Sequence, residues 1–351
     1  MLVAGTRPEI LKIYPIIIEL RERGIDYAFI STGQQRDLVK QTLESLKLVP
    51  DVDLNLMLAN QSPESFLSST LNKITGEIES YGPDFIIVQG DTSSALAGAL
   101  AGYLKKIPVG HVEAGLRSHD LYSPFPEEGF RRLIDSVSSF LWFPTENSKR
   151  VLEKDQFGIV VGNTIVDMLR IRAGQESETI YDPNRILVTL HRRESFETTL
   201  EKALTQIKKI ASESEYEFTF IEHPNPNVRK MMDKVGFTGS KLKILKPLPY
   251  LEFIELMSKS RAVITDSGGL QEEARSLRVP LLVMRDNTER MEALNSKQYR
   301  LTNPDGSELR EDLDAALSFS KESDSSGDKN PFGDGYSARY IVDGILESLK
   351  K

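Results

Sequence analysis

The sequence predicts an α/β fold with two doubly wound domains, each built around a parallel sheet, that face a central cleft. Three observations support this prediction. The chain has 351 residues, more than one hydrophobic core usually holds. Short apolar runs alternate with helical patterns in both halves, as in parallel sheets with crossover helices. Polar side chains follow several of these runs, where parallel strands commonly present ligand-binding groups.

The expected elements follow one another in βα order. In the first half, strands are expected at 1–4, 27–32, 84–89, 107–112 and 140–144, with helices up to about 23, through the forties, from the sixties into the seventies, and at 93–105 and 127–139. In the second half, strands are expected at 186–190, 217–221, 242–244, 262–265 and 280–284, and helices at 200–212, 250–258 and 270–277. A polar connection at 318–330 precedes a closing helix at 335–351. Thr6 and Glu9 have the spacing of a capping box, and Pro8 suits the first helical turn.

Composition limits the functional classes. Hydrophobic residues make up 39% and charged residues 27%, which is ordinary for a globular enzyme. The chain has no long apolar run and no signal-peptide pattern at its start, so a cytoplasmic protein without membrane contact is expected. The absence of cysteine excludes disulfides, thiolate metal sites and a cysteine nucleophile. A net charge of −8 argues against broad nucleic-acid binding.

A glycine turn in the second half is a candidate phosphate site. Residues 262–274 read A-V-I-T-D-S-G-G-L-Q-E-E-A, which predicts a strand, a turn and the start of a helix. Backbone N–H groups at such a turn bind phosphate, and a carboxylate shortly after it is suited to ribose hydroxyls. The alternative is a capped βα turn with no ligand.

Six polar residues follow expected strands directly: Arg7, Asp91, Glu113, His191, His223 and Asp266. Each has a structural alternative, such as capping of the next helix by Asp91, an ion pair between Glu113 and Arg117, or a loop hydrogen bond for His223. Groups from both halves would nevertheless converge on one cleft, which favours a functional site.

Other site chemistries lack their sequence patterns. No two histidines have the H-x-x-x-H spacing of zinc ligands on a helix, Ser267 lacks the G-x-S-x-G elbow, and no G-x-G-x-x-G follows the first strand. Cations near the strand ends suit a diphosphate: Arg7, Lys12, Arg192, Arg193, Arg285 and Arg290. Carboxylates together with diphosphate-binding groups indicate an enzyme that moves protons on a nucleotide sugar.

A series of motifs covers essentially the whole chain. They are G-T-R-P-E (5–9), Q-G-D-T (89–92), H-V-E-A-G-L-R (111–117), P-E-E (126–128), G-N-T-I-V-D (162–167), H-R-R-E-S-F (191–196), H-P-N-P-N-V-R (223–229), T-D-S-G-G-L-Q-E-E-A (265–274), R-D-N-T-E-R (285–290) and N-P-F-G-D-G (330–335). In this order, the chain closely resembles the non-hydrolysing UDP-N-acetylglucosamine 2-epimerases.

The resemblance implies the GT-B architecture of two Rossmann-like domains. The N-terminal domain would comprise 1–164 plus 336–351 and carry the catalytic carboxylates, and the C-terminal domain, 165–335, would bind UDP. The implied reaction interconverts UDP-GlcNAc and UDP-ManNAc by anti elimination of UDP to 2-acetamidoglucal and re-addition. It needs no cofactor and no metal. A homodimer is also implied.

The resemblance also assigns residues. It implies that Asp91, Glu113, Glu127 and His191 are catalytic, and leaves open which carboxylate removes the C2 proton. It implies that the substrate is bound by Arg7, Lys12, Arg192, His223, Phe253, Ser267, Gly268, Gly269, Glu273 and Arg290.

Some positions depart from the family pattern. Gln35 stands where members commonly have histidine, in a loop that binds an activating second UDP-GlcNAc in bacterial members, and Met291 replaces the proline usual after Arg290. Three alternatives stay open: a hydrolysing epimerase that releases ManNAc and UDP, a GT-B glycosyltransferase, and a non-catalytic UDP-sugar sensor. Neither the transferase nor the sensor needs all three carboxylates.

Overall fold

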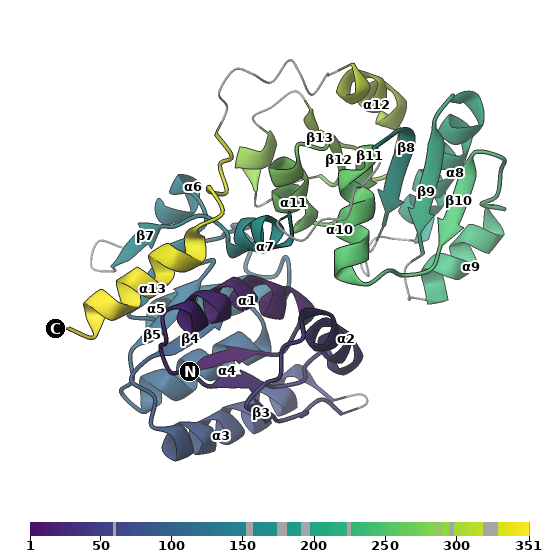
Figure 1. Cartoon of the computed structure of the whole chain (residues 1–351). Helices are drawn as coiled ribbons and strands as arrows, with labels where there is room; N and C mark the ends of the chain where they lie inside the picture. The colour runs from purple at the N-terminus through teal and green to yellow at the C-terminus, as the bar shows by residue number, and fades with distance from the viewer. Residues whose placement is uncertain are drawn as a thin grey trace. The chain divides into compact units, whose positions relative to one another are not determined.

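The computed structural model describes residues 1–58, 61–151, 157–173, 181–190, 197–222, 226–286, 288, 290–294, 298–318 and 329–350. The chain forms two compact units, Met1–Gln175 with Pro331–Lys351, and Glu176–Asn330 (Figure 1). The sequence predicts these boundaries after residue 164 and before residue 336. The first unit is longer than predicted because helix α7 (Thr164–Ala173) packs against helices α1 (Arg7–Glu22) and α13 (Ser337–Ser348).

The first unit contains a seven-stranded sheet in the order β3-β2-β1-β4-β5-β6-β7. Its strands are β1 (Leu2–Ala4), β2 (Phe29–Ser31), β3 (Val52–Asp53), β4 (Ile86–Gln89), β5 (Val109–Val112), β6 (Phe140–Phe143) and β7 (Gly158–Val160). All neighbours pair in parallel. The strand order reverses between β1 and β4, and ligands of open α/β sheets bind outside the carboxyl ends of strands at such a point.

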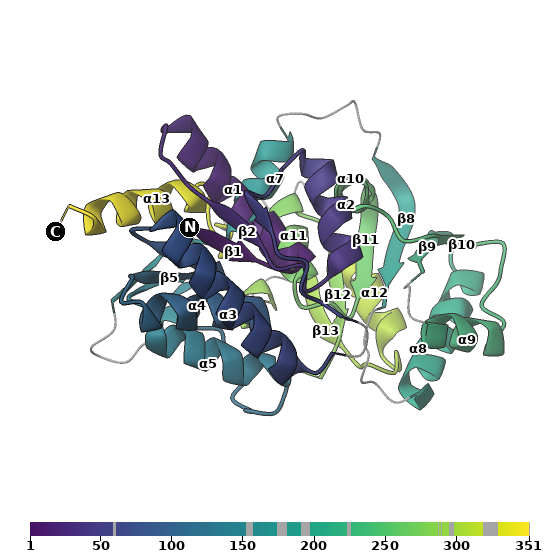
Figure 2. The same ribbon diagram turned by 90° about the horizontal axis from the view of Figure 1, so that it is seen from below.

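Helices cover both faces of this sheet. The remaining helices of the unit are α2 (Arg36–Leu46), α3 (Pro63–Tyr81), α4 (Ser93–Leu104), α5 (Glu127–Val137) and α6 (Glu146–Lys149). Figure 2 shows α3, α4 and α5 along one side of the sheet and α1 and α2 along the other. The small residues of α4 allow close packing, because a Cβ added at Gly98 would lie 2.9 Å from a Val88 methyl carbon.

The second unit repeats this architecture with six parallel strands in the order β10-β9-β8-β11-β12-β13. The strands are β8 (Asp182–Thr189), β9 (Glu217–Ile221), β10 (Leu242–Leu245), β11 (Ser260–Thr265), β12 (Leu281–Met284) and β13 (Tyr299–Thr302). The helices are α8 (Glu197–Glu213), α9 (Pro226–Lys234), α10 (Tyr250–Ser258), α11 (Leu270–Leu277), the 3-10 helix η1 (Met291–Leu294) and α12 (Leu309–Leu317).

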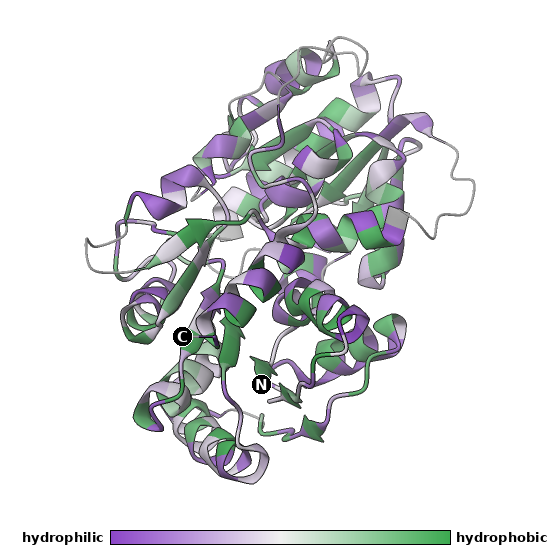
Figure 3. Ribbon diagram, turned by 60° about the vertical axis from the view of Figure 1, so that its left-hand side comes forward, coloured by the Kyte–Doolittle hydropathy of each residue, from purple (hydrophilic) through white to green (hydrophobic). Residues whose placement is uncertain are grey.

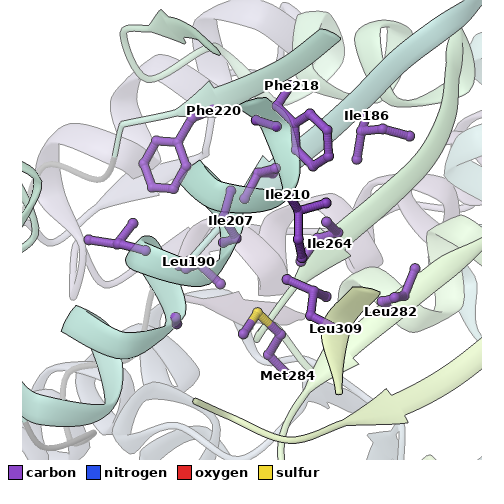
Figure 4. Packing of buried hydrophobic residues seen from close by; sticks show 14 of the residues in the cluster. Ile186, Leu190, Ile207, Ile210, Phe218, Phe220, Ile264, Leu282, Met284 and Leu309 are labelled. Carbon is purple, nitrogen blue, oxygen red and sulfur yellow. The ribbon is translucent and has the colours of Figure 1, made fainter. Parts of the chain in front are cut away.

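Apolar strands form the centre of each unit. In Figure 3 the strands are coloured mainly as hydrophobic, whereas the helices carry hydrophobic and hydrophilic residues in turn. In the second unit, Phe218 and Phe220 of β9 pack against Ile207 and Ile210 of α8 (Figure 4). Burial of such side chains stabilises the fold by about 1.5 to 3 kcal/mol each.

The α/β fold with two parallel-sheet domains is confirmed, while the cleft between the domains stays a prediction. Helices α6, α9 and α12, the 3-10 helix η1 and strands β3, β7 and β13 were not predicted. Among the described residues, no helix is both long enough and apolar enough to span a bilayer.

Candidate active site

Three predicted site residues follow adjacent strands of the first sheet. Arg7 comes after β1, Asp91 after β4 and Glu113 directly after β5. Strand β4 lies between β1 and β5, and Gln89 of β4 is paired in register with Val112 of β5. Because the strands are parallel, all three residues emerge at the same edge of the sheet.

Glu113 is held by donors from three other segments. Its carboxylate accepts hydrogen bonds from Lys12 Nζ at 2.7 and 2.6 Å, from Asn163 Nδ2 at 3.3 Å and from Gln89 Nε2. Glu113 and Lys12 are both buried, at 8% and 7% exposure. The carboxylate is therefore fixed as an ion pair shielded from water.

The backbone of Glu113 is also unusual. Its φ angle of 68° lies in the left-handed region, which costs a residue with a side chain about 1 to 2 kcal/mol. Such strain persists where the surrounding contacts determine the conformation, and it is common at active sites. The four hydrogen bonds to the side chain are contacts of this kind.

The alternative pairing of Glu113 with Arg117 is wrong. Arg117 Nη2 instead lies 2.7 Å from Asp135 Oδ2, and Lys12 takes the place opposite Glu113. Sheet order explains the difference, because β1 and β5 end at the same edge of the sheet and Lys12 lies early in the helix that follows β1.

Asp91 is held by an arginine rather than by a helix terminus. Arg131 of α5 donates to Asp91 Oδ2 from Nε at 3.1 Å and from Nη2 at 2.5 Å. The alternative role of Asp91 as cap of the next helix is wrong, because Thr92 is the N-cap of α4 and accepts the N–H of Ser94 and of Ala95. The Asp91 side chain stays 27% exposed, so it can reach a ligand.

Glu127 lies on the same side of α5 as the arginine that binds Asp91. It begins the helix, and Arg131 follows four residues later, so the two side chains share one helix face. Glu128 is fully buried and pairs with Arg131 and Arg132. Burial raises the pKa of Glu128, but the Ser118 N–H and the two arginines outweigh burial and hold it below its usual range.

The capping box predicted at the start of α1 is confirmed, and its Glu9 also contacts Thr92, the N-cap of α4. Glu9 accepts the N–H of Gly5 at 2.7 Å and of Thr6 at 2.8 Å, and the hydroxyl of Thr92. Burial raises the pKa of Glu9 to about 7, despite these hydrogen bonds. Arg7 is half-buried, and its backbone N–H donates to Gln35 at 3.2 Å.

In the second unit, the glycine turn follows β11 as predicted. The N–H of Ser267 donates to Thr265 Oγ1 at 3.0 Å, and Gly269 occupies the N-cap of α11. Gly269 has no side chain that could cap the first turn. Backbone N–H groups at this position suit an anion.

Side chains in the first turn of α11 fix residues around the turn. Glu272 pairs with Arg290 at 2.6 Å, with 1% and 11% side-chain exposure, and Gln271 exchanges hydrogen bonds with Thr288. Glu273, which is 6% exposed, accepts from the Tyr250 hydroxyl at 3.3 Å. Arg290, a predicted substrate-binding cation, is therefore held in place by a buried carboxylate.

Of four other predicted site residues, the structure describes one. Phe253 is half-buried on α10, one turn after Tyr250. His191, Arg192 and His223 lie outside the described residues. Within the described part of the chain, no group of three or more His, Cys, Asp or Glu residues could hold a metal ion.

Sequence reasoning gave no role to several residues that hold the site: Gln89, Arg131, Asn163 and Glu272. Gln89, Asn163 and Glu272 lie within the motifs Q-G-D-T, G-N-T-I-V-D and T-D-S-G-G-L-Q-E-E-A. Motif membership was therefore the signal that could have identified three of them.

Known proteins are similar to this chain over its whole length. A family model described as UDP-N-acetylglucosamine 2-epimerase matches residues 18–346. The UDP-N-acetylglucosamine 2-epimerase of Neisseria meningitidis is 35% identical, and the match covers 99% of this chain and 98% of that protein. A crystal structure of UDP-GlcNAc 2-epimerase from Neisseria meningitidis bound to UDP-GlcNAc superposes with a TM-score of 0.88 at 34% identity, covering 99% of both chains. The Methanocaldococcus jannaschii UDP-GlcNAc 2-epimerase in complex with UDP-GlcNAc and UDP gives a TM-score of 0.84 at 34% identity, with 99% of both chains covered.

Proposed function

Because the chain belongs to the UDP-N-acetylglucosamine 2-epimerase family, we propose that it interconverts UDP-GlcNAc and UDP-ManNAc without net hydrolysis. Relatives whose structures contain UDP-GlcNAc, at 34% identity over 99% of the chain, support this substrate. The reaction is an anti elimination followed by re-addition.

The bond changes balance without an oxidant or reductant. A base takes the C2 proton while the C1–O bond breaks, so C1 and C2 become doubly bonded and UDP leaves with the electron pair. In the return step, UDP oxygen bonds to C1 and a proton reaches the opposite face of C2. Two faces of one carbon require at least two acid/base groups.

The observation that carries the proposal is the acidic set of the first unit. Asp91 and Glu113 follow neighbouring strands, and Glu127 shares a helix face with the arginine bound to Asp91. Three carboxylates are thus available for proton transfer around one sheet edge. A GT-B glycosyltransferase or a UDP-sugar sensor has no use for all three, so both are weaker candidates.

We assign Lys12 a double role. Two of its contacts fix Glu113, and the same cation is assigned to substrate binding. Arg7, at the start of α1 beside this edge, is assigned to the substrate phosphates. His191, Arg192 and His223 keep their predicted roles at the sugar and phosphates.

UDP is assigned to the second unit. The backbone of Ser267, Gly268 and Gly269 would bind the diphosphate, Arg290 would add charge, Glu273 would bind the ribose and Phe253 would line the uracil pocket. The Glu272 carboxylate holds the Arg290 guanidinium before substrate arrives, which avoids part of the cost of ordering it on binding. A homodimer and a cytoplasmic location remain predictions.

Incubation with UDP-GlcNAc in deuterated water tests the proposal. Reversible formation of UDP-ManNAc with deuterium at C2 supports it, whereas free ManNAc with UDP would indicate the hydrolysing class. No exchange at C2 without an acceptor would contradict both kinds of epimerase.

A further inference from the structure

His111 lies at the centre of β5 and is fully buried, at 0% exposure. Both ring nitrogens have close partners. Nδ1 lies 2.7 Å from Asp135 Oδ1, and Nε2 lies 2.8 Å from the carbonyl oxygen of Gly90. The roles predicted for the acid residues do not use this histidine.

The partner of Nε2 determines its hydrogen. A carbonyl oxygen only accepts, so Nε2 must donate to Gly90. Asp135 lies opposite Nδ1, so both sides of the ring are held at hydrogen-bond distance. Burial raises the pKa of Asp135, but the His111 hydrogen bond and the charges of His111 and Arg117 outweigh burial and hold it below its usual range.

The same pair contacts every segment that carries a proposed acid. Gly90 directly precedes Asp91. Asp135 Oδ2 accepts the N–H of Gly115, two residues after Glu113, at 3.3 Å. Asp135 itself lies on α5, where Arg131 and Glu127 precede it at spacings of four residues along one face.

We propose that His111 and Asp135 are positioning residues that fix the two acid-bearing turns against α5. The hydrogen bond to Gly90 fixes the turn that carries Asp91, and the hydrogen bond from Gly115 fixes the turn that carries Glu113. Because Asp135 lies on α5, the pair also fixes the start of that helix at Glu127. Neither side chain is assigned to the substrate. The inference rests on the proposed function for its catalytic consequence, but the hydrogen bond from His111 Nε2 to Gly90 does not.

A buried hydrogen-bonded pair suits this task for a physical reason. Apolar packing is non-directional, whereas hydrogen bonds at both ring nitrogens fix the distance and angle of two turns at once. An error of about 1 Å in the placement of a reacting group can lower a rate about 100-fold. The pair therefore affects turnover more than it affects substrate affinity.

The first test is nitrogen NMR of protein labelled with ¹⁵N-histidine. The chain has four histidines, and the His111 signals are identified by their loss in His111→Gln. In the wild-type protein, Nε2 of His111 should carry the hydrogen that it donates to the Gly90 carbonyl. An unprotonated Nε2 would overturn the inference, whatever the activity.

The second test compares Asp135→Asn with a matched variant, Asp167→Asn. Asp167 is equally buried in the first unit, at 1% exposure, and accepts the Ala338 N–H at 2.7 Å, away from the acid-bearing turns. Asp135→Asn should lower kcat about 10- to 100-fold and leave KM within about threefold, whereas Asp167→Asn should lower the melting temperature and retain kcat. A wild-type kcat in folded Asp135→Asn would overturn the positioning role. If the wild-type protein shows no C2 exchange at all, the proposed function fails instead, and the NMR result on His111 stands by itself.

Discussion

Lys12 and Glu113 form a buried ion pair in which one ammonium contacts both carboxylate oxygens, at 2.7 and 2.6 Å. Lys12 lies on the helix that follows β1, and Glu113 follows β5, so the pair crosses the switch point of the sheet. It joins a predicted substrate-binding cation to a predicted catalytic acid. Both expected roles therefore depend on one contact.

Removal of either partner should destabilise the protein strongly. Lys12→Met or Glu113→Gln leaves an uncompensated buried group, which typically costs about 3 to 5 kcal/mol. The double variant should lose less than the sum of the single variants, by about 0.5 to 3 kcal/mol. Urea unfolding of all four proteins measures this coupling. Lys105→Met, which removes an exposed pair with Glu79, is the control and should change the free energy of unfolding little. If the losses of the Lys12 and Glu113 single variants simply add in the double variant, the coupling is refuted.

The acidic set of the first unit should be needed for turnover but not for nucleotide binding. Asp91→Asn, Glu113→Gln and Glu127→Gln should each lower kcat about 100- to 10,000-fold, the usual contribution of acid/base catalysis. Calorimetry should show UDP affinity close to that of the wild-type protein, because UDP is assigned to the second unit. Glu19→Gln, a partly exposed change on α1, is the control. Wild-type turnover in any one of the three variants would remove that residue from the mechanism.

Local and long-range signals explain what the sequence could predict. Thr6 and Glu9 lie three residues apart, so their capping box was visible in the sequence and is confirmed. Lys12 and Glu113 are separated by 101 positions, and only the strand order brings them together, which is why the sequence suggested the nearby Arg117 as the partner of Glu113. Strand β13 was missed because four residues with Arg300 inside them give too short an alternation to recognise.

The ion pair of the second unit should control UDP affinity. Glu272→Gln removes the charge that holds Arg290, and hydrogen bonds to charged groups contribute about 1.5 to 3 kcal/mol. We expect the Kd for UDP, measured by calorimetry, to rise about 10-fold or more. The matched variant Asp312→Asn removes a pair with Arg300 elsewhere in this unit and should leave Kd unchanged. Equal affinities of Glu272→Gln and wild type would rule out this supporting role.

Glu9 should make stability depend on pH. Burial raises its pKa from 4.5 to about 7, so the folded state favours the protonated acid. This contribution is complete below pH 4.5 and is lost as pH rises through about 7. Glu9→Gln lacks the titration, so the stability of the wild type relative to the variant should fall over this range. A constant difference between the unfolding free energies of the two proteins from pH 4.5 to about 7 would contradict the raised pKa of Glu9.

Exchange at C2 tests the central claim most directly. Protein and UDP-GlcNAc are incubated in deuterated water, and the sugar is followed by proton NMR. The account predicts that UDP-ManNAc forms reversibly, that deuterium enters C2 of both nucleotide sugars, and that Asp91→Asn abolishes both signals. Conversion to UDP-ManNAc with the C2 proton fully retained would contradict it.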